Sequence, residues 1–68
     1  MTRKQAEDKI REIANDDRLQ ITGSRGDWYI DNREGYTLDR RGPGHRTLTD
    51  VIEYVEFCVK VEHPIIHL

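Results

Sequence analysis

The longest apolar stretch of this chain runs from Thr47 to about Val61. At 100° per residue its polar side chains fall in one narrow arc, made of Thr49, Glu53, Glu56 and Lys60. Apolar or half-polar side chains cover most of the remaining circumference: Leu48, Val51, Ile52, Tyr54, Val55, Cys58 and Val59. This pattern predicts a helix that the rest of the fold must cover nearly all round. Residues 55–62 also alternate as a strand does, so that alternative stays open, and Pro64 ends either element.

The N-terminal part of the chain predicts an amphipathic helix over residues 3–15. Thr2 and Gln5 have the spacing of a capping box. A narrow apolar stripe recurs at helical spacing: Ala6, Ile10, Ile13 and Ala14. Glu7 and Arg11 form a favourable pair four residues apart, on the side expected to face water.

Three short runs of alternating residues follow, at 19–22, 28–31 and 36–39, with turns at 23–26 and 32–35. They predict an antiparallel meander with one apolar face: Leu19, Ile21, Trp28, Ile30, Tyr36 and Leu38. The opposite face is expected to meet water: Gln20, Thr22, Tyr29, Asp31, Thr37 and Asp39.

Residues 1–68 are therefore expected to form a single small α+β domain. The architecture is a two-layer sandwich, with a helix, a three-stranded antiparallel sheet and a second helix, and both helices lie on one face of the sheet. The predicted core is Ile10, Ile13, Leu19, Ile21, Trp28, Ile30, Leu38, Leu48, Val51, Ile52 and Val55.

The last residues are unusually apolar for a chain end. Ile65, Ile66 and Leu68 would forgo burial energy if all three stayed in water. We expect this apolar C-terminal tail to dock on the fold, to add a strand, or to pair with a second copy in a homodimer.

Composition narrows the class of protein. The chain is 35% hydrophobic and 35% charged with a net charge of −2, which fits a folded domain and argues against a membrane span or a disordered tail. The lone Cys58 cannot close a disulfide within the chain. The N-terminus is too charged for a signal peptide, so we expect a cytoplasmic protein.

Candidate chemistry is sparse. Residues 40–46 form a basic loop in which Arg40, Arg41 and Arg46 surround glycines, a composition suited to an anion, to phosphates or to a partner's acidic groups. Trp28 and Tyr29 are candidate aromatic anchors for a partner. We expect no cofactor and no metal site, because the zinc-type residues Cys58, His63 and His67 lack a fourth ligand. We expect no enzyme either, because no His or Ser has the spacing of a catalytic triad.

The stretch KIREIANDDRLQITGS, residues 9–24, is followed by a predicted hairpin and a late acidic helix. In size and element order this layout resembles some small phage-encoded anti-CRISPR proteins. Several members of that group inhibit an effector by presenting an acidic surface where nucleic acid would bind, whereas this chain has a net charge of only −2 and a basic loop.

The resemblance implies a non-enzymatic protein-binding module from a phage or mobile element, one that inhibits a host defence nuclease by steric occlusion. Its partner would be a larger protein or nucleoprotein complex, with no role for a membrane. The alternative is a small nucleic-acid-binding domain that sets the basic loop against phosphates and stacks Tyr29 on a base.

Overall fold

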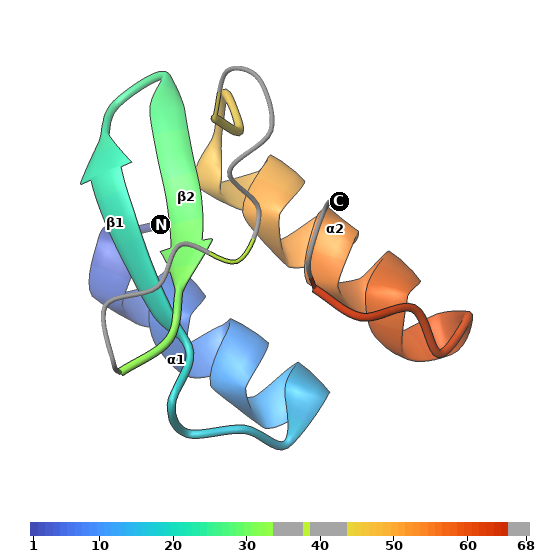
Figure 1. Cartoon of the computed structure of the whole chain (residues 1–68). Coiled ribbons are helices and arrows are strands. Elements are labelled where there is room, and N and C mark those ends of the chain that lie inside the picture. The colour runs from blue at the N-terminus through green and yellow to red at the C-terminus, as the bar shows by residue number, and fades with distance from the viewer. Residues whose placement is uncertain (34–37, 39–43, 66–68) are drawn as a thin grey trace.

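The computed structural model describes residues 1–33, 38 and 44–65. Its elements are helix α1 (Arg3–Ala14), strands β1 (Gln20–Ser24) and β2 (Asp27–Asp31), and helix α2 (Leu48–Lys60). The two strands form an antiparallel hairpin, and the two helices run side by side in the same direction (Figure 1). The α+β class and the order helix, antiparallel sheet, helix are confirmed.

Helix α1 begins as its sequence predicts. The side chain of Thr2 accepts a hydrogen bond from the Gln5 N–H, and the side chain of Gln5 accepts one from the Thr2 N–H, which completes the capping box. The helix ends at Asn15, which adopts a left-handed conformation with φ 52° and donates its N–H to carbonyls of the last turn.

The hairpin pairs Ile21 with Ile30 and closes through a two-residue turn at residues 25–26. Within the described residues the sheet has two strands. The outer edge of β2 makes two further contacts: Leu38 donates its N–H to the Ile30 carbonyl at 2.7 Å, and His45 exchanges two backbone hydrogen bonds with Trp28. Residues 34–37 and 39–43 lie outside the described part of the chain, so the third strand stays a prediction.

Helix α2 decides the open assignment of residues 55–62, because residues 55–60 are helical. Thr47 caps the helix by accepting a hydrogen bond from the Asp50 N–H at 3.0 Å. The expectation that the helix is covered nearly all round is wrong at its C-terminal half, where Phe57 is 56% and Val59 46% exposed. Within the described residues α2 buries Val51, Ile52, Val55 and Cys58, because α1 and the hairpin cover one side of it.

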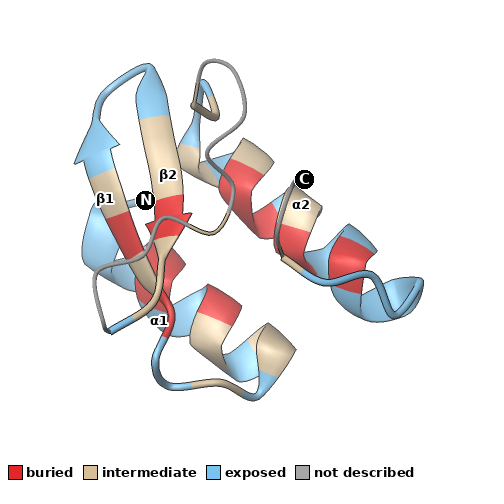
Figure 2. Cartoon of the chain, in the orientation of Figure 1, coloured by how far each residue is buried: buried red, intermediate tan, exposed pale blue. Residues whose placement is uncertain are grey.

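The core lies between the two helices and one face of the hairpin (Figure 2). Most of the predicted core is buried, and Ala6 joins it: Ala6, Ile10, Leu19, Ile21, Ile30, Val51, Ile52 and Val55. The other predicted members are half-buried and pack against this cluster: Ile13, Trp28, Leu38 and Leu48. Ile65 also packs on it, which places the start of the tail against the fold, while residues 66–68 lie outside the described residues.

Glu7 is the main correction to the predicted helix face. The i,i+4 pair with Arg11 is present at 3.2 Å, but the Glu7 side chain is only 9% exposed instead of facing water. Its carboxylate accepts hydrogen bonds from the Ile21 N–H and from the Arg3 guanidinium, both at 2.8 Å. The side chain is buried because β1 crosses this part of α1 and brings a backbone N–H that needs an acceptor.

Neither helix of the described chain is long and apolar enough to cross a membrane.

Candidate functional site

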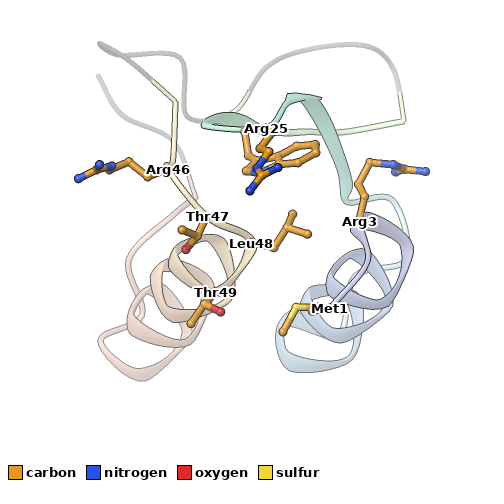
Figure 3. Close-up of a pocket in the computed structure, with 8 residues that line it drawn as sticks. Met1, Arg3, Arg25, Arg46, Thr47, Leu48 and Thr49 are labelled. Atoms are coloured by element: carbon orange, nitrogen blue, oxygen red, sulfur yellow. The ribbon is translucent and has the colours of Figure 1, made fainter.

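A cavity of about 430 Å³ opens where the N-terminal ends of α1 and α2 meet the hairpin turn (Figure 3). Three arginines line it, one from each of these places: Arg3 in α1, Arg25 in the turn and Arg46 just before α2. The remaining described lining is apolar or uncharged: Met1, Trp28, Thr47, Leu48 and Thr49. We call this site the arginine pocket. It gathers positive charge, without an acidic lining residue among those described, in a chain whose net charge is −2.

The three arginines differ in whether other residues of the fold already bond their guanidinium groups. Arg3 is held by the fold, because it bonds the Glu7 carboxylate at 2.8 Å and the Ile21 carbonyl at 3.2 Å. Arg25 and Arg46 are exposed, and neither has an ion-pair or hydrogen-bond partner among the described residues. In Figure 3 Arg25 lies between the helix ends, whereas the ends of Arg3 and Arg46 point outward on opposite sides. Two arginines are therefore available to a ligand along an extended rim.

Helix α2 adds backbone donors to the same place. The N–H groups of Leu48 and Thr49 are the first two of the helix, where the helix itself supplies no acceptor. Among the described residues no backbone or side-chain oxygen accepts from either group. The positive end of the helix dipole adds to the arginine charge, although Asp50 in the same turn offsets part of it.

The pocket floor is apolar and fixed in position. Trp28 and Leu48 are half-buried, and both pack against the core cluster. The Trp28 N–H donates to the His45 carbonyl at 2.9 Å and the Trp28 carbonyl accepts from the His45 N–H at 2.7 Å, while Gly23 of β1 lies opposite Trp28 in the hairpin. A ligand therefore meets a preformed surface of apolar side chains with guanidinium groups at its rim.

The structure brings only some of the sequence-predicted site residues together in the pocket. Trp28 and Arg46 both line the pocket. Tyr29 follows Trp28 in a strand and so projects from the opposite face of the hairpin, across from Thr22. That face is half-buried, contrary to the expectation that it meets water, and Thr22 donates a hydrogen bond to Asp31 at 2.8 Å. Arg40 and Arg41 lie outside the described residues.

Sequence reasoning missed Arg3 and Arg25. One signal was available for Arg3: α1 starts with Arg3 and Lys4 and has no acidic residue in its first turn, although the positive end of a helix dipole favours acids. A residue that breaks such a local preference often serves a site. Arg25 carries no comparable signal, because an arginine in a tight turn is ordinary.

The described residues hold no group of three His, Cys, Asp or Glu side chains placed to bind a metal ion. Cys58, the single cysteine of the chain, is buried and forms no disulfide. Of the other zinc-type residues, His63 bonds the Pro64 carbonyl and His67 lies outside the described part of the chain.

Comparisons with protein-family models, with curated proteins and with solved structures found no match to this chain. Its function is therefore inferred from the chemistry of the arginine pocket.

Proposed function

We propose that this protein is a non-enzymatic binding module that docks on a larger protein through the arginine pocket and occludes a site there. One observation carries the proposal: the half-buried apolar pair Trp28 and Leu48 lies beside Arg25 and Arg46, two arginines that have no partner among the described residues. Tryptophan and arginine are the residues most enriched among the energetically dominant contacts of protein interfaces.

The elements and side chains that form the pocket favour binding over catalysis. Its walls are a hairpin turn and the first turns of two packed helices, so little backbone has to be ordered when a partner docks. The lining offers guanidinium groups, hydroxyls and backbone N–H donors, but no described His, Cys or carboxylate to act as a base or nucleophile. Such a surface can hold an acidic group without transforming it.

Steric inhibition of a host defence nuclease, as the resemblance to anti-CRISPR proteins implies, is one way of using such a surface. The second candidate, nucleic-acid binding, is favoured by the positive charge of the lining. The nucleic-acid-binding domain expected from the sequence, with the basic loop on phosphates and Tyr29 on a base, needs Tyr29 and Arg46 on one surface. Tyr29 lies on the other face of β2 and does not line the pocket, which weakens that form.

Affinity capture from source-cell lysate tests the proposal, with nuclease-treated and untreated samples in parallel. The variant Arg25→Gln/Arg46→Gln removes the two available guanidinium groups, whereas Lys9→Gln/Lys60→Gln removes the same charge from exposed positions outside the pocket lining. We expect the wild type and the lysine variant to retain the same protein with or without nuclease, and the arginine variant to lose it.

Two results would overturn the proposal. Equal retention by both variants would show that the pocket is not the contact surface. Retention that disappears after nuclease treatment, and that falls steeply between about 50 and 200 mM salt, would identify a nucleic-acid-binding domain instead.

A further inference from the structure

We infer that the ligand of the arginine pocket is an extended acidic peptide segment in which a large apolar residue stands between two acidic ones. This inference rests on the proposed function and names the chemistry of the partner segment. Three features carry it: the spread of the arginines, the apolar floor between them, and the orphan N–H groups at the start of α2.

The spread of the arginines selects an extended ligand. Arg25 lies between the helix ends and Arg46 points outward on one side, so the two available guanidinium groups do not converge on one point, while Arg3 on the opposite side is already bonded to Glu7 (Figure 3). A single small anion would meet one of them at a time. An extended peptide rises about 3.3 Å per residue, so acids four residues apart are roughly 13 Å apart and can reach guanidinium groups that do not converge.

The floor selects an apolar side chain at the middle of that segment. In an extended peptide residues i, i+2 and i+4 face the same side, so acids at the ends of the motif place the central residue over Trp28 and Leu48. The cavity of about 430 Å³ falls in the range of roughly 300–1,000 Å³ typical of sites for small ligands, so it holds side chains and not a folded element. The Leu48 and Thr49 N–H groups are then available to an acidic oxygen beside this residue.

The same features disfavour a nucleic acid. Base stacking needs an open aromatic face, but Trp28 is half-buried and packs against the core, and Leu48 offers no ring. The net charge of −2 repels a polyanion along most of its length, whereas a short acidic segment meets only the positive pocket.

Fluorescence titration with short synthetic peptides tests the inference, because Trp28 is the single tryptophan of the chain and lies in the pocket. The probe is the blocked peptide SDSLSDS. Its controls are SDSSSDS, which lacks the apolar residue, SNSLSNS, which lacks the charges, and SSDLDSS, which keeps the composition but turns the acids away from the leucine. Oligothymidylate of the same length is the nucleic-acid probe.

We expect SDSLSDS to shift the Trp28 emission with saturation, and each peptide control to bind at least about tenfold more weakly. Loss of the burial of one leucine accounts for that much in SDSSSDS, and loss of a hydrogen bond between charged groups accounts for it in SNSLSNS and SSDLDSS. Arg25→Gln/Arg46→Gln should also lose about tenfold, and Lys9→Gln/Lys60→Gln should bind like the wild type. Circular dichroism checks that all variants fold, which their exposed positions favour.

Three outcomes would overturn the inference: no emission change up to millimolar peptide, equal binding of SDSLSDS and SSDLDSS, or tighter binding of oligothymidylate than of any peptide. Lysate capture separates this result from the proposed function. If a protein is captured through Arg25 and Arg46 but no peptide binds, the inference about the ligand is wrong and the binding module stands. If peptides bind as expected but no protein is captured, the docking function is wrong.

Discussion

Replacement of Glu7 by alanine is expected to remove a large share of the stability of this domain. The Glu7 carboxylate accepts hydrogen bonds from the Ile21 N–H and the Arg3 guanidinium at 2.8 Å and pairs with Arg11 at 3.2 Å. Hydrogen bonds to charged groups contribute about 1.5–3 kcal/mol each, and a buried N–H left without an acceptor costs about 1–3 kcal/mol.

The two arginines limit the loss, because their side chains are 47% and 28% exposed and water can solvate them when the carboxylate is gone. Removal of one partner from a fully buried ion pair costs about 3–5 kcal/mol, so we expect Glu7→Ala to lower the free energy of unfolding by about 2–4 kcal/mol. A domain of 68 residues has roughly 3–10 kcal/mol in total. Glu7→Gln should lose less than Glu7→Ala, since the amide oxygen can still accept from Ile21.

Urea unfolding followed by circular dichroism and Trp28 emission measures these differences. Asp8→Ala is the matched control, because the Asp8 side chain is 59% exposed and its ion pairs with Lys4 and Arg11 are 3.7 and 3.8 Å long. Such surface pairs contribute roughly 0–1 kcal/mol. If Glu7→Ala lies within about 0.5 kcal/mol of Asp8→Ala, the bond between α1 and β1 does not stabilise the fold as described.

Three further predictions concern the core, the hairpin and acid stability. Val55→Ala should destabilise by about 2–4 kcal/mol in urea melts, because Val55 is fully buried between the layers; a loss below about 0.5 kcal/mol would contradict this packing. Gly23→Ala should lower the melting temperature, since Gly23 has φ 101° and a Cβ there would overlap the Asp27 carbonyl; an unchanged melt would show that the turn relaxes. The pKa of Asp16 lies below its usual 3.8, chiefly because the Arg18 backbone N–H donates to its carboxylate. The stability that the Asp16 carboxylate adds is therefore present above pH 3.8 and lost as the pH falls through the lowered pKa. Asp16→Asn should make the free energy of unfolding less dependent on pH between these two values, and an acid unfolding curve identical to that of the wild type would contradict this.

The parts of the fold that depend on local sequence could be predicted. The capping box at Thr2 and the apolar hairpin face that holds Ile21 and Ile30 follow from spacings of a few residues, and the structure contains both. The sequence predicts helix α2 but leaves a strand over residues 55–62 open, and the structure shows a helix through Lys60.

The remainder depends on which elements pack together. Glu7 stands next to the apolar stripe of α1, and nothing in its own segment reveals that β1 will bring an unpaired N–H to it. The pocket unites Arg3, Arg25 and Arg46, which are far apart in the chain and meet only because both helices start at the hairpin turn. The basic loop was conspicuous because its arginines are adjacent in sequence, whereas the arginines of the pocket are adjacent only in space.

The packing of α1 against α2 also determines when this chain can fold during its synthesis. The two helices are the first and last elements in order, and the core lies largely between them. Until α2 has left the ribosome, the buried faces of α1 and of the hairpin lack the helix that covers them. A hairpin alone is at best marginally stable in water, and an isolated helix as short as α1 is marginal as well. Folding is therefore delayed until α2 has emerged, and until then the nascent chain exposes the apolar residues of α1 and the hairpin to chaperones and proteases.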